Sequence, residues 1–582
     1  MKKVLALMLM LVFAATCCWA QGNNAKLSPD LRNMNTSSNA QVIVQYNSAP
    51  SLLDLNLLGL LGQIVNSLPL VNGIVAELPL KNILSLSNQT NVKYISLDRA
   101  LTPTLSNAAP AVNAFAAWQS GYTGAGIGVA LIDSGVYSHP DLKGGLLGLS
   151  RVVWNQSFVS GNSSPNDQYG HGTHVAGLIA GDGASSTGSS YTRTFEGIAP
   201  KANIVNLRVL DQNGEGTDSA VIAAINEAIA LKLLFNIRVM NLSLGRAVFE
   251  TYKLDPLCQA VEAAWKSGIV VVVSAGNNGR YVPTEGYGTI TAPGNDPYVI
   301  TVGAMNMNGT PTRVDDVMAS YSSKGPTAVD AIVKPDLVAP GNLLVSLNDP
   351  GSTLYNEYPA NRVPNSYYES KGSSASSTTY FTLSGTSMAA GVVSGVVADL
   401  LQAHPSLTPD QLKARLMKTA WKALPAYSSY TDPTSGVTYN DQDDVFTVGA
   451  GYVDVEAALS NNDVATKTAM SPVATFVSTG DVKMVDDPSS VWNTSSTWTN
   501  SLVWGSSQFE VGTGASAAAA SNTVSGTNAL WGGSAPWGSN ALWGGSTTGG
   551  ENALWGGNAL WGGSGMYSNN ALWGGSAPGG EK

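Results

Sequence analysis

The chain has 582 residues, of which 44% are apolar and 12% are charged, and its formal net charge is −10. The length predicts more than one structural unit, and the apolar content is sufficient for a large core. The negative charge, without a long basic run, argues against nucleic acid as a partner. A weakly charged surface rich in Gly, Ser, Asn and Thr is typical of an exported protein.

The first residues have the pattern of an export signal. Lys2 and Lys3 precede a short apolar run at 4–15, and Ala20 offers a small residue for cleavage. The run is too short for a membrane span. We therefore expect residues 1–20 to be a signal peptide and the protein to be secreted, with retention in a periplasm or at the cell surface as the alternative.

Cleavage after Ala20 removes two of the three cysteines. Neither Cys17 nor Cys18 has the preceding pattern of a lipoprotein site, so that alternative is weaker. Cys258 then remains alone and forms no internal disulfide. We expect it to be a small buried hydrophobe, with a catalytic thiol as the minor alternative.

Residues 21–105 are predicted to form a small α+β module. Strand and helix patterns alternate along it, which is the order that favours such a module. The strands are expected at 42–44, 73–76 and 92–97, and the helices at 52–65 and 80–87.

Residues 106–460 alternate apolar strands with helices. In the helical pattern at 219–234, apolar residues from Ile222 to Leu233 recur at helical spacing. This alternation predicts an α/β fold, with a parallel sheet covered on both faces and ligands bound beyond the carboxyl ends of the strands. The strands are expected at 126–132, 203–209, 238–243, 268–274 and 298–303.

Residues 461–582 form a C-terminal extension of different composition. Its later part repeats Asn-Ala-Leu-Trp-Gly-Gly five times, at starts between Asn528 and Asn570. Trp492, Trp498 and Trp504 are also six residues apart. Because six is even, an extended chain would place every Trp on one side. An ordered Trp-faced β repeat and a flexible low-complexity tail both remain open.

Three segments carry residues with catalytic potential. The first is the apolar run 129–132, which leads directly into Asp133. A carboxylate after a buried strand is costly without a partner. Taken alone, a turn-capping Asp is at least as good an interpretation as a catalytic one.

The second segment, Gly170-His171-Gly172-Thr173-His174, opens a predicted helix. Two His three residues apart raise the possibility of a metal site. A zinc-protease helix, however, needs His four apart with an adjoining Glu, and neither is present here. Metal ligation by this pair is therefore the weaker interpretation, and no metal ligand is assigned.

The third segment is Gly385-Thr386-Ser387-Met388-Ala389, a loop that opens an apolar helix. A Ser at a helix start is usually only an N-cap. The same position also gives a nucleophile a nearby backbone N–H and the positive end of a helix.

Together the segments point to nucleophilic catalysis. A hydroxyl needs a base to take its proton, and the base needs a third group to hold its tautomer. The three segments, beginning with Asp133-Ser134-Gly135, resemble the signature motifs of the subtilisin-like (subtilase) serine protease family, and the similarity extends over residues 120–458.

This resemblance implies roles for individual residues. Ser387 would be the nucleophile, His171 the general base and then acid, and Asp133 the orienting carboxylate. Asn277 matches the side chain that donates to the oxyanion, and His174 resembles a structural His. The edges of a groove that binds the substrate as an added strand would be Ser243, Leu244, Gly245, Ser274, Ala275 and Gly276.

The resemblance also implies a serine endopeptidase that acts on polypeptides. Residues 21–105 resemble the family's inhibitory propeptide, so the chain's own propeptide is an expected partner, and its autocatalytic removal is expected between 100 and 113. The pocket preference of the family is apolar or aromatic, and Thr291 is placed where it would narrow that pocket.

Two departures from the family pattern are visible. Gly391-Val392 stand where the family has Pro-His. His139-Pro140-Asp141 resembles a stretch whose Asp can bind calcium, but a companion loop is not recognisable between Asp182 and Phe195. No cofactor is required for the chemistry, and a structural calcium ion is left open without being predicted.

The rival hypothesis is a binding protein built on a protease-like scaffold. An inactive scaffold would be free to lose catalytic residues, yet Asp133, His171, Asn277 and Ser387 are all present. We therefore assign binding, to a cell-surface or carbohydrate partner, to the Trp-rich extension as an added role. Removal of 487–582 is expected to leave peptidase activity intact.

Overall fold

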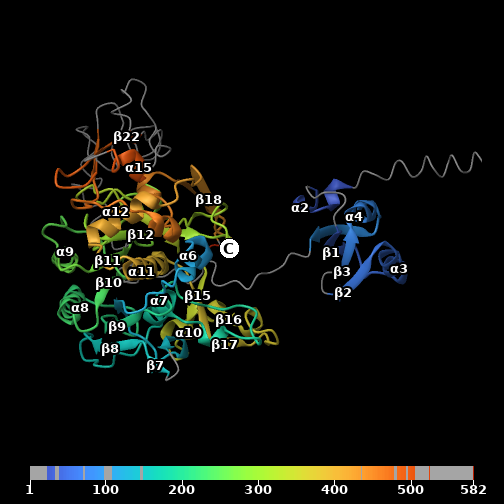
Figure 1. The fold of residues 1–582 in the computed structure, drawn as a ribbon, viewed down its shortest axis with the longest axis horizontal. Helices are drawn as coiled ribbons and strands as arrows, with labels where there is room; N and C mark the ends of the chain where they lie inside the picture. Colours follow the sequence, from blue (N-terminus) through green and yellow to red (C-terminus); the bar gives the residue numbers. More distant parts are fainter. Residues whose placement is uncertain are drawn as a thin grey trace, which may run out of the picture. The chain divides into compact units, whose positions relative to one another are not determined.

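The structure is a computed structural model of the chain. It describes residues 23–32, 39–69, 72–97, 108–144, 148–433, 435–476, 482–492, 496–504, 523–524 and 581. The predicted signal peptide and the Asn-Ala-Leu-Trp-Gly-Gly repeats lie outside these residues. The chain divides into two compact units, Met1–Thr102 and Pro103–Lys582, and each is described by itself (Figure 1).

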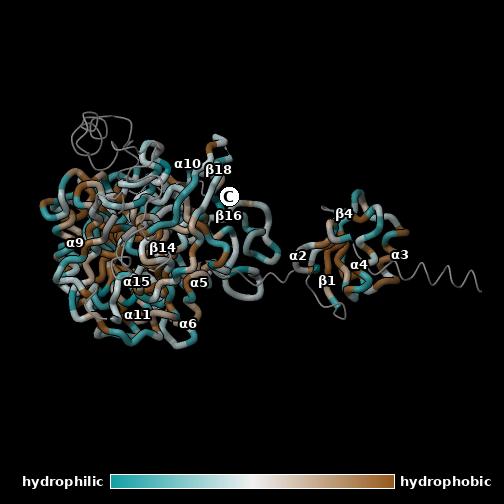
Figure 2. Tube along the Cα trace, turned by 90° about the horizontal axis from the view of Figure 1, so that it is seen from above, coloured by the Kyte–Doolittle hydropathy of each residue, from teal (hydrophilic) through white to brown (hydrophobic). Residues whose placement is uncertain are grey.

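The first unit is an antiparallel sheet with strand order β2-β3-β1-β4. Figure 2 shows hydrophobic residues along β1, and Val42 and Val44 of this strand are fully buried. The strands are β1 (Asn39–Tyr46), β2 (Gln63–Leu68), β3 (Gly73–Pro79) and β4 (Val92–Leu97), and the helices are α2 (Pro29–Arg32), α3 (Leu52–Leu61) and α4 (Leu80–Ser87).

The sequence-based prediction missed β2 and extended the helix α3 too far, to residue 65. Helix α3 begins at a capping box formed by Ser51 and Asp54, and it stops at Gly62. A Cβ on Gly62 would lie 2.3 Å from the carbonyl oxygen of Glu77 in β3. Only a glycine allows this approach, which turns the chain into the edge strand β2.

The second unit contains an eight-stranded sheet of order β13-β12-β11-β10-β5-β9-β8, with β14 paired to β12. All pairs are parallel except β12 with β13. This confirms the predicted α/β fold. Its strands are β5 (Gly128–Asp133), β8 (Val152–Ser157), β9 (Asn203–Arg208), β10 (Ile237–Leu242), β11 (Val270–Ser274), β12 (Ile300–Asn306), β13 (Val317–Met318) and β14 (Leu337–Pro340).

The strand order reverses at β5, which lies between β9 and β10. In a doubly wound sheet, ligands bind beyond the carboxyl ends of the strands at such a switch point. Asp133 is the last residue of β5 and therefore lies at this position.

Two pairs of helices cover the sheet (Figure 1). Helix α11 (Thr386–Ala403) packs on α7 (His171–Ala180) and on β10, β11 and β12. Helix α8 (Asp218–Leu231) packs on α9 (Pro256–Lys266) and on β5, β9 and β10. The helix predicted at 219–234 is too long at its C-terminal end, because Leu233 lies beyond the end of α8. Leu233 is 92% exposed, since the chain turns at Lys232 to enter β10.

Helix α11 is long and apolar enough to cross a membrane, and it is the one such helix among the described residues. Of its 18 residues, 89% are buried within the unit. This burial identifies α11 as the core helix of the domain, and its residues from Thr386 to Leu401 are all buried.

The beginning of the C-terminal extension packs onto this unit. Trp492, Trp498 and Trp504 are buried in a second core with Met417 and Phe446. The extended alternative, which the sequence left open, does not hold for these three Trp residues, because 496–499 form a loop and Asn500–Trp504 form the short helix α15. The spacing of six nevertheless brings two rings together, since those of Trp492 and Trp504 are 5.0 Å apart in a T-shaped contact.

The second unit has further small sheets and helices. Strands β15 (Leu344–Leu347), β16 (Arg362–Pro364) and β17 (Ser376–Leu383) form one sheet, and β20 (Val473–Phe476), β21 (Val482–Val485) and β22 (Thr523–Val524) form another. Two pairs are β6 (Lys143–Gly144) with β7 (Leu149–Ser150) and β18 (Tyr427–Thr431) with β19 (Thr438–Gln442). The further helices are α5 (Ala108–Ala111), α6 (Ala114–Gln119), α10 (Thr353–Glu357), α12 (Pro409–Thr419), α13 (Val445–Val448) and α14 (Val455–Ser460).

Candidate active site

A buried carboxylate and a buried imidazole form the centre of the candidate site. Oδ1 of Asp133 lies 2.7 Å from Nδ1 of His171, and each residue is 1% exposed. Asp133 ends β5, and His171 begins α7 after Gly170, whose φ of 105° suits a glycine. The backbone N–H of Ser134 also donates to Oδ1 at 2.7 Å, which fixes the carboxylate.

The neighbouring carboxylates change the pKa of His171. Burial lowers the pKa of His171, but the charge and hydrogen bond of Asp133, together with the charge of Asp167, outweigh it and raise the pKa above its usual value. Nε2 of His171 is buried without a hydrogen-bond partner. The pair can therefore accept a proton at Nε2 and stabilise the resulting charge.

Ser387 is the second residue of α11 and is 1% exposed. Its backbone N–H belongs to the first turn, where a helix has no internal acceptor. The helix can approach α7 closely because a Cβ on Gly391 would already lie 3.3 Å from Cγ1 of Val175. The replacement of Pro-His by Gly391-Val392 is thus accommodated by close helix packing.

The three predicted catalytic residues lie on adjoining elements, but one hydrogen bond is not formed. The Ser387 hydroxyl donates to the carbonyl oxygen of Ser243 at 3.1 Å, and not to His171. In turn, the Ser243 hydroxyl donates to the carbonyl oxygen of Ser387 at 2.8 Å. A catalytic hydrogen bond such as that from Ser387 to His171 is commonly long or misaligned without substrate and tightens when substrate binds.

The side-chain amide of Asn277 lies against the start of α11. Its Oδ1 accepts from the backbone N–H of Thr386 at 2.9 Å and from the Thr386 hydroxyl at 3.1 Å. The backbone donor determines which amide atom is the oxygen. Asn277 is therefore oriented beside the residue that precedes Ser387.

The six predicted groove residues follow the ends of β10 and β11. Ser243, Leu244 and Gly245 come directly after β10, whereas Ser274 ends β11 and Ala275 and Gly276 follow it.

Thr291 separates the two edges of this groove. A Cβ on Gly245 would lie 2.5 Å from Oγ1 of Thr291, and a Cβ on Gly276 would lie 2.9 Å from its Cγ2. The backbone N–H of Thr291 donates to the carbonyl oxygen of Ala275 at 3.0 Å. The Thr291 side chain thus fills the space between the two glycines and is 4% exposed.

Asp167 is a site residue that the sequence-based reasoning missed. Its two carboxylate oxygens accept from the backbone N–H groups of Gly170 and Thr173 and from the hydroxyls of Ser134 and Thr173, at 2.7–2.8 Å. Burial raises the pKa of Asp167 although these donors oppose it. Its place shortly before a predicted helix start was the available signal, because Asp there commonly caps the helix.

His174 has a structural position, in agreement with the interpretation from the sequence. Its Nε2 lies 3.0 Å from the carbonyl oxygen of Leu344 and 3.2 Å from that of Phe381. Burial and the nearby His171 lower its pKa to about 3. A neutral His174 therefore joins α7 to the sheet of β15 and β17.

Asp141 does not fit the role of a calcium ligand in this structure. One of its oxygens accepts from the backbone N–H of Ser185 at 2.8 Å, and the other accepts from the Tyr380 hydroxyl at 2.7 Å. Calcium instead prefers several oxygen ligands and no competing donors. Within the described part of the chain, no cluster of three or more His, Cys, Asp or Glu residues could hold a metal ion.

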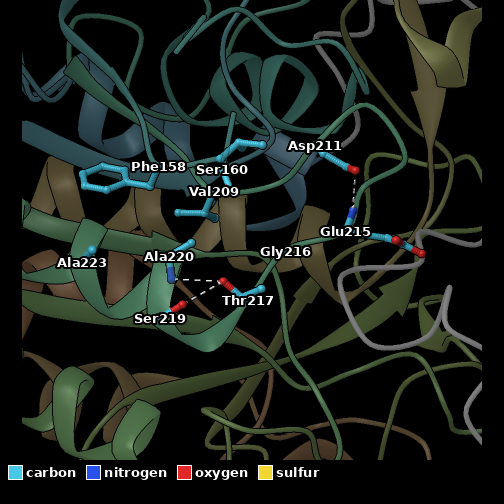
Figure 3. A pocket seen from close by; sticks show the side chains of 11 residues that line it. Phe158, Ser160, Val209, Asp211, Glu215, Gly216, Thr217, Ser219, Ala220 and Ala223 are labelled. Atoms are coloured by element: carbon cyan, nitrogen blue, oxygen red, sulfur yellow. Dashed lines mark hydrogen bonds between the residues drawn. The ribbon is translucent and has the colours of Figure 1, made fainter. Parts of the chain in front are cut away.

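A hollow of about 500 Å³ lies beside the end of β9 (Figure 3). Val209 is part of its lining and also donates its backbone N–H to the carbonyl oxygen of Asp133 at 2.8 Å. Thr217 caps α8 at the hollow through the backbone N–H of Ala220. The lining is formed by Phe158, Val159, Ser160, Val209, Asp211, Glu215, Gly216, Thr217, Ser219, Ala220 and Ala223.

Comparison with known proteins agrees with this geometry. Residues 124–452 match the Subtilase family of peptidases, and this span includes all the candidate site residues. The chain belongs to the subtilase family. It is therefore a serine endopeptidase, as the sequence predicted, and its substrates are polypeptides.

Individual relatives cover most of the same region. The chain is 39% identical to the serine protease AprX of Bacillus subtilis over 343 residues, which is 57% of this chain and 70% of that protein. It is 33% identical to subtilisin DY of Bacillus licheniformis over 350 residues, covering 60% and 96% of the two chains. Thermitase of Thermoactinomyces vulgaris is 33% identical over 300 residues, covering 51% and 82%.

Proposed function

We propose that this subtilase hydrolyses peptide bonds through an acyl-enzyme on Ser387. His171 takes the hydroxyl proton at Nε2 as Ser387 Oγ attacks the carbonyl carbon, and Asp133 stabilises the imidazolium. His171 then gives that proton to the departing amine, and water releases the acyl group by the same route. The observation that supports this proposal is the buried 2.7 Å contact between His171 and Asp133, with Nε2 left without a partner.

Attack requires the Ser387 hydroxyl to turn away from the Ser243 carbonyl, which accepts from it at 3.1 Å. We infer that this turn accompanies substrate binding, because the carbonyl belongs to the groove edge. The developing oxyanion would then accept hydrogen bonds from the side-chain amide of Asn277 and from the backbone N–H of Ser387. Such donors act on charge that exists only in the transition state.

The substrate would bind as an added strand between the edges 243–245 and 274–276. Backbone pairing gives affinity with little sequence preference, so the pocket between the edges determines specificity. Thr291 lies between Gly245 and Gly276 and reduces the space available there. We therefore propose a preference for small or medium apolar side chains before the cleaved bond.

We also propose that residues 1–20 direct export and that residues 21–105 are an inhibitory propeptide removed by the enzyme itself. In support, the first unit forms its own sheet and core. It also exposes Leu52, Leu53 and Leu60 by 79–85%, and such an apolar surface favours a protein partner. The mature enzyme would act outside the cell or at its surface.

The experiment is expression of the full chain beside Ser387→Ala, followed by mass measurement and casein hydrolysis. We expect the wild type to lose its first unit and to digest casein, and Ser387→Ala to keep that unit and stay inactive. Equal behaviour of the two chains would contradict both the nucleophile and the self-processing. Processing of Ser387→Ala by added wild-type enzyme would show whether cleavage acts between molecules.

For the repeat-bearing part of the extension we propose a binding role towards a cell surface or a carbohydrate. The functional boundary must follow Trp504, because Trp492, Trp498 and Trp504 belong to a buried core. Removal of 487–582, which the sequence predicted to leave peptidase activity intact, would expose that core and lower stability. Removal of 505–582 should keep casein hydrolysis and reduce binding to cells or to polysaccharide, whereas unchanged binding would argue against this role.

A further inference from the structure

Glu581 lies beyond the Trp repeats in the sequence and is buried in the second unit, with an exposure of 2%. Its Oε1 accepts from the backbone N–H of Ser320 at 2.8 Å and from Nη2 of Arg280 at 3.0 Å, and also from the Ser320 hydroxyl. A buried carboxylate is costly unless it is paired and hydrogen-bonded. The surroundings of Glu581 meet that requirement for Oε1.

The backbone of Glu581 is held as well as its side chain. Its N–H donates to Oδ1 of Asn342 at 2.9 Å, and its carbonyl oxygen accepts from Nδ2 of Asn342 at 2.7 Å. One side-chain amide thus pairs with both backbone groups of one residue, as a neighbouring strand would. This pairing selects an extended chain and not only a negative charge.

Arg280 is fixed before it reaches Glu581. Its Nε donates to the Ser320 hydroxyl at 2.8 Å. Its guanidinium also lies over the rings of Tyr430 and Tyr439 of the β18–β19 hairpin, at 5.0 and 4.9 Å from their centres. A planar cation held over two neighbouring rings keeps its donors in position for a carboxylate.

The same loops continue into the active site. Arg280 follows Asn277 by three residues, and the intervening Gly279 donates its N–H to the carbonyl oxygen of Tyr321 at 2.8 Å. Gly341, next to Asn342, accepts from the backbone N–H of Gly385 at 2.8 Å, two residues before Ser387. Glu581 therefore lies on the loops that support the candidate oxyanion residue and the nucleophile.

We propose that Arg280, Ser320 and Asn342 form an acceptor pocket for Glu581, which fastens the far side of the Trp-repeat segment to the peptidase domain. The segment between Trp504 and Glu581 is then joined to the domain at both sides. This inference is independent of the catalytic roles, because it rests on contacts outside the catalytic residues.

The test measures the distance between two nitroxide labels in the full chain. The labels are carried by Lys582→Cys and by Asn226→Cys, which is exposed on α8. The starting chain also carries Ser387→Ala, to prevent self-digestion, and Cys17→Ala and Cys18→Ala. The remaining Cys258 is fully buried, so it does not react with the label.

We expect one narrow distance distribution in the starting chain and a broad one after Glu581→Lys, which places two cations together. Arg280→Met should broaden it equally. Glu551→Lys is the matched control, because it makes the same charge change within the repeats, and it should leave the distribution narrow. Excess unlabelled chain should change nothing, since the contact lies within one molecule.

A broad distribution in the starting chain would overturn the proposal, and so would a narrow one after Glu581→Lys. Loss of the narrow distance on adding unlabelled chain would also overturn it, by assigning the pocket to a second copy. If circular dichroism shows that Arg280→Met is unfolded, the test rests on Glu581→Lys alone. This substitution changes a residue outside the sheet and its helices.

Discussion

Nδ1 of His171 and Oδ1 of Asp133 are 2.7 Å apart in a site where each of the two residues is 1% exposed. Asp167 lies close to this pair, and its charge also raises the pKa of His171. The imidazole is therefore influenced by two carboxylates, of which only Asp133 touches it. This arrangement makes the pH dependence of the enzyme a sensitive test of the site.

Asp167→Asn should shift the acidic limb of the kcat/KM profile to lower pH. His171 must be neutral to act as a base, and loss of the Asp167 charge lowers the pKa at which it becomes neutral. Asp211→Asn, in the loop that follows β9, is the control and should leave the limb in place, because the charge of Asp211 is not among the causes of the raised pKa of His171. A role of Asp167 limited to capping α7 would lower the thermal midpoint without moving the limb.

Asn277→Ala should lower kcat by about 10²–10³ while KM changes little, because the amide acts only on transition-state charge. The measurement is steady-state hydrolysis of a peptide anilide. Asn278→Ala is the matched control one residue along, since Asn278 is held through its backbone N–H by Ser323. Equal losses in both variants would indicate a disturbed loop and not a lost donor.

Thr291→Gly should enlarge the pocket between Gly245 and Gly276. We expect kcat/KM for a peptide with Phe before the cleaved bond to rise by about tenfold relative to one with Ala. Thr289→Gly, two residues earlier on the same segment, serves as the comparison. An unchanged Phe-to-Ala ratio in Thr291→Gly would remove Thr291 from the pocket.

Asp399→Leu should stabilise the protein, and more so as pH rises. Both carboxylate oxygens of Asp399 are buried in α11 without a partner, and burial raises its pKa well above the usual value. Above the pKa of the unfolded state, the folded chain retains a proton that the unfolded chain releases, so increasing pH favours unfolding. Leu removes this dependence.

The measurement for Asp399→Leu is the urea midpoint at about pH 5 and about pH 8. The gain over wild type should be larger at the higher pH. Glu250→Gln removes an exposed carboxylate and should shift neither midpoint appreciably. A destabilised Asp399→Leu at both pH values would mean that this carboxylate has a stabilising role.

The sequence was sufficient for the fold class, whereas the position of the switch point came from the strand order of the structure. The apolar runs 126–132, 238–243 and 268–274 indicated a parallel sheet, in which the loops that follow the strands meet at one edge. Motif resemblance then predicted the enzyme class, which the family match confirms. The roles of individual residues stay predictions until they are tested by mutation.

The features that the sequence did not reveal depend on contacts between distant residues. Gly62 ends α3 because of the approach of Glu77, and no local pattern shows that approach. In the sequence, Asp167 cannot be told from an ordinary helix-capping residue. Its hydrogen bond from the Ser134 hydroxyl forms only when the chain folds. Glu581 gave no signal at all, because its partners Arg280 and Asn342 lie more than two hundred residues away.

The most direct test of the central claim is the site of modification by an organophosphonate that reacts with activated serines. The account predicts one adduct, mapped by peptide mass to Ser387, that forms in step with loss of casein hydrolysis. His171→Ala should abolish the adduct, because the hydroxyl then has no base. Complete inactivation with the adduct on another residue, or a normal rate of modification in His171→Ala, would contradict the account.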